Sequence, residues 1–202
     1  MSSSSPNDAK LDPRVRRTRA LLGQAFVEAL SEKGFQAISV QDITERAGVN
    51  RTTFYLHFPD KYALVDYSIS QMFRQEIEKR KMDVCHFSEE NLRSLIIMVS
   101  EFVAFSSSHC ARPEPQFESL VETQVKKQVQ DVLQMWLEQA GSQVDSRTAA
   151  IAASWAIYGL ALQWTREKKR PSVAKFADNV SPLIVAILGL AQPVRDPIPA
   201  LD

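Results

Sequence analysis

One stretch near the N-terminus, residues 39–61, constrains the fold of this chain more than any other. Its sequence, SVQDITERAGVNRTTFYLHFPDK, predicts two short helices joined by a tight turn. Ser39, followed by Asp42, is suited to cap the first helix, and Gly48 can end it in the left-handed conformation that costs other residues energy. Asn50 is suited to cap the second helix. Two helices joined by a short glycine-containing turn form the unit that places its second helix in the DNA major groove, so this stretch predicts DNA binding.

The second helix of this unit carries side chains that can contact DNA. Arg51 can donate two hydrogen bonds to guanine, and Tyr55, one turn later, can offer its hydroxyl to a base or a phosphate. Phe54 and Phe58 recur at a four-residue interval and are expected to pack inward. Taken singly, these are residue types that any solvated helix carries, so the DNA-binding interpretation rests on their combination with the capped turn.

The same region resembles the DNA-binding domain of the TetR family of bacterial transcriptional regulators. The resemblance extends over about residues 14–66 and is specific because many positions agree at fixed spacing. One departure is Thr44, where the family more often has alanine; threonine is close enough in size to leave the expected fold unchanged. The matching residues are Leu21, Leu22, Gly23, Gln24, Ala25, Phe26, Glu32, Lys33, Gly34, Phe35, Ile43, Ala47, Gly48, Val49, Thr53, Phe54, Tyr55, His57, Phe58, Lys61 and Leu64.

The resemblance also implies roles for individual residues. Ser39 resembles the phosphate-touching N-cap of the family, in keeping with the attraction of anions to helix N-termini. Asn50, the expected cap of the second helix, belongs to the predicted DNA-binding set. The residues expected to face the bases are Arg51, Thr52 and Tyr55, together with Gln41, whose position sometimes reaches a base. Those expected to hold phosphates, besides Ser39, are Thr53, His57 and Lys61.

The charge distribution is uneven although the formal net charge is zero. Residues 1–61 hold nine Lys/Arg against seven Asp/Glu, and residues 62–202 hold fifteen against seventeen. A neutral chain does not coat DNA nonspecifically, but basic residues before and inside the first helix form an arm that can reach phosphates. A solvated helix start and tail explain them equally well. These residues are Lys10, Arg14, Arg16, Arg17 and Arg19.

The rest of the chain predicts helices throughout, so the expected fold class is all-α. We expect an N-terminal three-helix helix-turn-helix head on a larger helical bundle body, with about nine helices in all. Apolar residues recur at helical spacing in residues 14–33, 60–81, 89–108, 116–139, 146–168 and 172–190. The expected divisions are a disordered Ser-rich arm at 1–12, the DNA-binding domain at 13–60, a ligand-binding and dimerisation domain at 61–192 and an irregular tail at 193–202.

The last two expected helices offer apolar faces of different size. Small residues recur along residues 149–159, whereas residues 180–191 carry bulkier ones. In the family, the last two helices of each subunit form a four-helix dimer interface, so the resemblance implies a homodimer. Packing within one chain explains the same periodicity, but a protein with one recognition helix gains affinity and palindrome selectivity by pairing. The expected DNA partner is therefore a palindromic double-stranded operator.

Large side chains spread over four expected helices of the body indicate an apolar ligand cavity, although most of them are equally suited to a core. The resemblance implies a repressor that a small-molecule effector releases from its operator. A DNA-binding activator or an architectural protein without small-molecule control is the alternative. The side chains are Met98, Phe102, Phe105, His109, Phe117, Trp136, Trp155, Tyr158 and Trp164, and none is assigned to a binding site.

Other classes of function find little support in the sequence. It has no paired nucleophile and base and no Gly-rich phosphate loop, so we expect neither an enzyme nor a cofactor. Cys85 and Cys110 each neighbour a histidine, but a helix about 30 Å long is expected between them, which argues against a metal site and a disulfide. The longest nearly apolar run, residues 149–162, is too short to cross a bilayer. No segment resembles an export signal, so we expect a cytoplasmic protein without a membrane partner.

Overall fold

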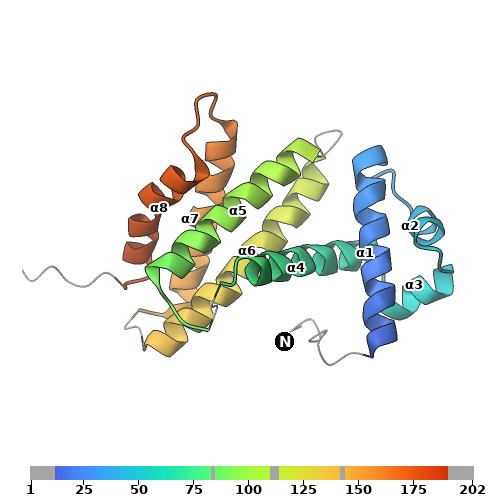
Figure 1. Ribbon diagram of the computed structural model, residues 1–202, viewed down its shortest axis with the longest axis horizontal. Helices are drawn as coiled ribbons and strands as arrows, with labels where there is room; N and C mark the ends of the chain where they lie inside the picture. Colours follow the sequence, from blue (N-terminus) through green and yellow to red (C-terminus); the bar gives the residue numbers. More distant parts are fainter. Residues whose placement is uncertain (1–11, 83–84, 110–113, 142–143, 191–202) are drawn as a thin grey trace, which may run out of the picture.

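The computed structural model describes residues 12–82, 85–109, 114–141 and 144–190. Within these ranges the chain forms eight α-helices and no strand, which confirms the all-α prediction. The expected number of about nine helices is one too high, because each helical segment identified in the sequence forms a single helix. Figure 1 shows the helices of the N-terminal part gathered at one end of the molecule and those of the C-terminal part at the other, with a long helix leading from one group to the other.

The head consists of α1 (Pro13–Lys33), α2 (Val40–Ala47) and α3 (Arg51–His57). Asp12 caps α1 by accepting a hydrogen bond from the Arg14 N–H at 2.7 Å, and Pro13 occupies the first turn, where a missing N–H costs nothing. The three helices enclose a small core of buried apolar side chains. Helices as short as α2 and α3 are not stable alone, so packing on α1 stabilises them. The largest members are Leu22, Phe26, Phe35, Ile38, Ile43 and Phe54.

The fourth helix, α4 (Lys61–Lys79), connects the head to the body (Figure 1). Asp60 caps it through the Ala63 N–H at 2.8 Å. Leu64, Val65 and Ile69 are buried on the side that packs against α1 and α6. A polar contact adds to this packing, since the Gln128 side chain of α6 donates to the Ser70 hydroxyl of α4 at 3.1 Å. α4 therefore belongs to both halves of the molecule.

The body is built from α5 (Glu89–His109), α6 (Pro115–Ala140), α7 (Ser146–Arg166) and α8 (Val173–Ile187). α7 packs against α5, α6 and α8, and α5 also packs against α8. The apolar spacing read from the sequence is realised, since Val125, Val129 and Leu133 of α6 are all fully buried, as is Trp136 one turn further on. An ion pair joins the Arg93 guanidinium of α5 to the Asp178 carboxylate of α8 at 2.6 Å.

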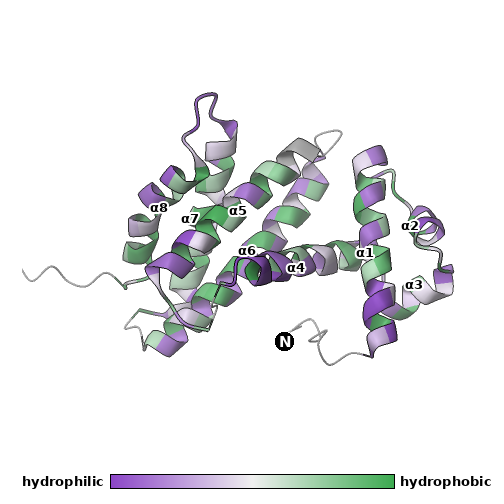
Figure 2. Cartoon of the chain, in the orientation of Figure 1, coloured by the Kyte–Doolittle hydropathy of each residue, from purple (hydrophilic) through white to green (hydrophobic). Residues whose placement is uncertain are grey.

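Apolar and polar residues alternate along the helices (Figure 2). The buried apolar residues of head and body belong to one continuous core. Within the described ranges, none of the helices combines the length and the apolar character needed to cross a membrane.

Candidate nucleic-acid interface

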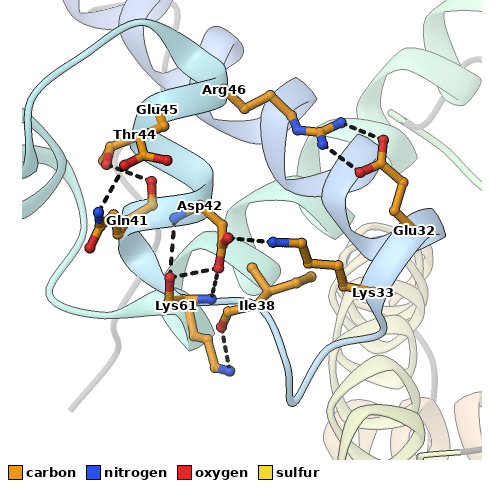
Figure 3. A network of polar contacts seen from close by, with 10 residues as sticks. Glu32, Lys33, Ile38, Gln41, Asp42, Thr44, Glu45, Arg46 and Lys61 are labelled. Carbon is orange, nitrogen blue, oxygen red and sulfur yellow. Dashed lines mark hydrogen bonds and ion pairs between the residues drawn. The ribbon is translucent and has the colours of Figure 1, made fainter.

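The first helix of the predicted DNA-binding unit begins at a complete capping box. The Ser39 hydroxyl accepts the Asp42 N–H at 3.1 Å, and the Asp42 carboxylate accepts the Ser39 N–H at 2.8 Å. Lys33, at the end of α1, donates to the same carboxylate (Figure 3). Hydrogen bonds from Lys33 and then from Ser39 hold the pKa of Asp42 well below its usual range. The carboxylate therefore stays charged and fixes the start of α2 against α1.

The turn between α2 and α3 has the predicted chemistry. Gly48 adopts the left-handed conformation with a φ of 68°, and the Val49 N–H donates back to the Thr44 carbonyl at 3.0 Å. Asn50 then caps α3, because its side-chain oxygen accepts the Thr53 N–H at 2.7 Å and the Thr53 hydroxyl at 2.9 Å. The departure at Thr44 is accommodated, since this buried residue donates its hydroxyl to the Gln41 carbonyl at 3.0 Å.

The recognition helix α3 is anchored by one face and exposed on the other. Phe54 is fully buried, and its ring centroid lies 5.9 Å from that of Phe58. On the opposite face, Tyr55 is 50% exposed and Leu56 is 78% exposed. Arg51 and Thr52 are exposed as well. Leu56 was not predicted as a contact residue, although its position directly after Tyr55 on a helix with Phe54 and Phe58 inward places it outward. An exposed leucine can contact a thymine methyl group.

The other predicted DNA-binding residues are partly engaged within the head. The Thr53 hydroxyl is bonded to Asn50, and the Gln41 amide donates to the Glu45 carboxylate at 2.8 Å (Figure 3). Burial, followed by the nearby Arg19 charge, lowers the pKa of His57. The lowered pKa favours the neutral imidazole, which can still meet a phosphate as an N–H donor.

Lys61 has a structural role that the sequence did not predict. Its ammonium group donates to the Phe35 carbonyl at 2.9 Å and to the Gln36 carbonyl at 3.4 Å. It also donates to the Ile38 carbonyl at 2.9 Å (Figure 3). It also lies 4.5 Å from the centre of the Phe35 ring. Burial lowers the pKa of Lys61, and the charge of Glu114 opposes that change. All three ammonium hydrogens can be used in the turn between α1 and α2, so we leave Lys61 out of the contacts proposed below.

The basic residues of the first helix divide into two groups. Arg14, Arg16 and Arg17 are exposed along the start of α1. Arg19 instead lies over two rings, 5.4 Å from the centre of Phe58 and 5.6 Å from that of Tyr67. It stabilises the junction of α1 with α3 and α4, which leaves the first three as the available cations. Lys10 lies outside the described residues.

A cavity lies between head and body. Its volume is about 100 Å³, and α1, α4, α5 and α6 all contribute to its walls. Of the large side chains that the sequence suggested for a cavity, Phe102, Phe105 and Phe117 line it. Met98 and Trp136 are core residues, and the remainder lie elsewhere or, like the His109 side chain, outside what is described.

The sequence also singled out Tyr158 and the two cysteines. The Tyr158 side chain is buried, and burial raises the pKa of its hydroxyl to about 12. Cys85 is exposed, whereas Cys110 lies outside the described residues. Across the part of the chain that is described, no three His, Cys, Asp or Glu side chains gather in an arrangement that would hold a metal ion.

The capped α2, the left-handed turn at Gly48 and the half-exposed α3 define a helix-turn-helix protein. Residues 24–67 match the family model for bacterial regulatory proteins of the tetR family. The helix-turn-helix unit of this chain is therefore similar in sequence to the DNA-binding domain of the TetR family.

Two curated relatives match part of the chain. An uncharacterized HTH-type transcriptional regulator of Bacillus subtilis, YxbF, is 35% identical over 72 residues, which cover 35% of this chain and 19% of the relative. A second from the same organism, YvdT, is 31% identical over 86 residues, which cover 43% of this chain and 44% of the relative. The matched regions span less than half of each relative.

Solved structures extend the likeness to the whole fold. A TetR-family regulator from Streptomyces coelicolor superposes with a TM-score of 0.60 at 18% identity, covering 88% of this chain and 97% of that one. FadR from Bacillus subtilis, solved in complex with stearoyl-CoA, gives a TM-score of 0.55 at 20% identity and covers 85% and 99%. FadR from Thermus thermophilus, described as a TetR-family repressor in complex with lauroyl-CoA, gives 0.56 at 20% identity and covers 91% and 99%. At these identities the likeness establishes the fold alone.

Proposed function

We propose that this chain is a sequence-specific DNA-binding transcriptional regulator, a homodimeric repressor that a small-molecule effector releases from its operator. The observation that carries the proposal is the recognition helix α3. It is capped by Asn50 and anchored by buried Phe54, and it presents Arg51, Thr52, Tyr55 and Leu56 to solvent. A helix fixed on one face and exposing such donors on the other is suited to the major groove.

The proposed contacts follow from exposure and from hydrogen-bonding capacity. Arg51, Thr52 and Tyr55 read bases, with Leu56 as an apolar contact and Gln41 as a further donor. The residues proposed to meet phosphates are Ser39, Thr53 and His57, together with the exposed Arg14, Arg16 and Arg17.

The proposed dimer interface is the outer face of α7 and α8. Trp155 of α7 is 61% exposed, Leu183 of α8 is 51% exposed, and Ile151 lies exposed one turn before Trp155. The alanines of α7 instead divide between this face and the interior, since Ala150 and Ala153 are fully buried. Large apolar groups exposed on adjacent helices favour association with a second copy. Such a dimer presents two recognition helices to half-sites about 34–36 Å apart, one turn of DNA.

The effector part of the proposal draws support from the fold. The two FadR proteins that share it were solved with acyl-CoA molecules bound. This chain has an apolar cavity beside α4, the helix that joins the head to the body. A ligand that binds one arrangement of head and body better than another shifts the population between them, and operator affinity follows. A regulator of bacterial genes with this activity works in the cytoplasm.

Selection of bound sites from random duplex DNA, with the purified full-length chain at a fixed moderate salt concentration, tests the proposal. Enrichment of a palindrome whose half-sites are spaced by about one turn is the expected result. Binding without sequence enrichment would point to an architectural protein, and absence of binding would contradict the proposal. The similarity of this fold to that of transcriptional regulators gives no support to an enzymatic role.

A further inference from the structure

The cavity between head and body is almost wholly apolar. Phe26 and Leu30 of the head form one wall, and Val65, Ile69 and Phe117 form the opposite ones. Residues of the head and of the body are thus combined in one site, because α1 contributes as directly as α4, α5 and α6. A ligand here contacts the DNA-binding head itself.

The polar side chains around the cavity are already satisfied by their own helices. Ser31 donates its hydroxyl to the Glu28 carbonyl at 2.8 Å, Ser68 to the Leu64 carbonyl at 2.8 Å, and Ser106 to the Val103 carbonyl at 3.1 Å. None of the described residues that line the cavity is charged. A buried charge or a hydrogen-bonding group on a ligand would lose its hydration without replacement here, so the site selects uncharged hydrocarbon.

The size and the opening of the cavity further restrict which ligands can bind. Its volume of about 100 Å³ is somewhat smaller than the roughly 150 Å³ of an apolar cavity that binds benzene, so a single ring or a short alkyl segment is the largest group that it can enclose. Val27 of α1 and Phe105 of α5 line it and are also exposed to solvent, so they mark its mouth. A larger molecule can therefore place one ring or a short alkyl segment inside and leave any polar part in solvent.

We propose that this cavity is a binding site for the uncharged hydrocarbon part of an effector, a single ring or a short alkyl segment. The proposal rests on the proposed function for its regulatory meaning, although the binding itself does not depend on it.

The wall residue Phe117 links the cavity to the DNA-binding unit. Its ring centroid lies 5.1 Å from that of Phe35, in the turn between α1 and α2. Phe35 in turn receives the Lys61 ammonium on its carbonyl and near its ring. Three residues before Phe117, the Glu114 carboxylate accepts the Gln36 N–H of the same turn at 2.9 Å. A ligand that displaces Phe117 therefore acts on the segment that leads directly into α2.

The first test measures binding of toluene to the full-length protein without DNA, by titration followed with NMR of the methyl groups that line the cavity. We expect saturable shifts at Leu30, Val65 and Val121. Ser68→Leu fills the cavity from α4, and Ser31→Leu fills it from the mouth, where an exposed position tolerates the change. Ser119→Leu, on the exposed side of α6, is the matched control. Both filling variants are expected to bind toluene at least tenfold more weakly, and the control to bind it normally.

Unchanged toluene affinity in a folded filling variant, or no saturable binding to the natural chain, would overturn the proposal. A second measurement repeats operator binding, on the palindrome from site selection, with and without saturating toluene. We expect toluene to lower the operator affinity of the natural chain and of Ser119→Leu several-fold, and to leave the filled variants unaffected. If bound toluene leaves the operator affinity unchanged, the regulatory role proposed for the cavity is contradicted. If the chain binds toluene but selects no DNA sequence, the cavity site stands and the proposed function is overturned. If it binds an operator but not toluene, the proposed function stands and the cavity site is overturned.

Discussion

The Glu114 carboxylate accepts a hydrogen bond from the backbone N–H of Gln36 at 2.9 Å, and this contact joins the start of α6 to the turn between α1 and α2. The two residues are 78 positions apart in the sequence. The contact lies beside Gly34, whose backbone approaches the same carboxylate so closely that an added Cβ would stand 2.4 Å from Oε1. Head and body are thus held together by a polar contact that requires a glycine.

We expect Glu114→Ala to reduce the free energy of unfolding by about 1.5–3 kcal/mol, because hydrogen bonds to charged groups contribute about that much. Urea denaturation followed by circular dichroism measures it. Glu78→Ala, which removes an exposed carboxylate from α4, is the control and is expected to change stability by less than about 0.5 kcal/mol. Equal effects of the two substitutions would mean that the contact with Gln36 contributes nothing.

Gly34→Ala tests the close approach separately. Gly34 and Gly48 both have positive φ angles, 77° and 68°, but their ψ angles differ. Gly48, with a ψ of 30°, lies in the left-handed region, where alanine is strained by about 1 kcal/mol, whereas Gly34, with a ψ of 159°, lies in a region essentially restricted to glycine. Only at Gly34 does the new methyl group meet another side chain, whereas nothing lies within 4 Å at Gly48. We therefore expect Gly34→Ala to be the more destabilising of the two. The difference should become smaller when both are made in the Glu114→Ala protein, because the contact with Oε1 is then gone and only the backbone strain at Gly34 remains. An unchanged difference there would mean that the close approach to Glu114 contributes nothing.

Substitutions on the recognition helix should weaken operator binding without unfolding the protein. We expect Arg51→Ala and Tyr55→Ala each to cost about 1–3 kcal/mol of binding free energy, the usual value of a base contact. Leu56→Ala should cost less but should relax the base preference at one position. Electrophoretic mobility shifts on the selected operator measure all three, with Lys169→Ala, in the connection between α7 and α8, as the control. Unchanged affinity in Arg51→Ala and Tyr55→Ala would remove α3 as the reading helix.

Lys61→Met distinguishes a structural lysine from one that holds a phosphate. Its loss leaves the carbonyls of Phe35 and Ile38 without their partner, so we expect unfolding to become easier by about 1–3 kcal/mol. The salt dependence of operator binding should stay the same. A phosphate contact would instead reduce the slope of log affinity against log salt by about 0.9. Lys79→Met removes an exposed lysine near the other end of α4 and should change neither quantity.

Substitution of Asp131 and of Asp145 by asparagine should change the stability at pH 7 in opposite directions. Asp131 is exposed, but partial desolvation by its surroundings raises its pKa, and the Lys127 charge opposes that change only in part. The folded state then holds its proton more tightly than the unfolded chain. The stability that this proton provides is complete below pH 3.8 and is lost as the pH rises through the folded pKa. Asp131→Asn is therefore expected to stabilise the protein at pH 7 and to lose this advantage near pH 3.

Asp145 provides the comparison. Hydrogen bonds from Thr148, through its side chain and then its N–H, lower the pKa of this cap of α7. Its contribution is present above pH 3.8 and is lost as the pH falls through the folded pKa. Asp145→Asn should therefore destabilise the protein at pH 7 and have little effect near pH 3. The midpoints of urea denaturation at pH 3 and pH 7 measure the stability of both variants. Stability changes of the same sign at pH 7 for the two substitutions would contradict the assigned pKa shifts.

The features that the sequence predicted are those that depend on near neighbours. The caps at Ser39 and Asn50 and the turn at Gly48 involve residues within five positions of one another, so they can be predicted from the local sequence. Helix ends likewise fall within a few residues of the expected ones. The inward placement of Phe54 and the outward placement of Tyr55 follow from helical spacing alone.

The features that escaped prediction depend on residues distant in sequence. Lys61 resembles a phosphate-holding lysine until the turn at Phe35, 26 positions earlier, is folded against it. The cavity requires α1 to meet α5 and α6, and most large side chains suggested for it pack elsewhere because apolar residues of core and pocket are chemically alike. Gly34 matched the family, but its need for Glu114 appears only with the tertiary structure.

The engagement of Lys61 has a mechanical consequence. Because the first residue of α4 is tied to the turn that precedes α2, the reading head and α4 form a single rigid arm. A tilt of this arm against the body would turn about the contact between Ser70 of α4 and Gln128 of α6. Ser70 lies nine residues beyond Lys61, about 14 Å along the helix, so a tilt of about ten degrees there carries the start of α4 through about 2.4 Å. In the proposed dimer, shifts of this size change the spacing of the two recognition helices relative to that of the DNA half-sites.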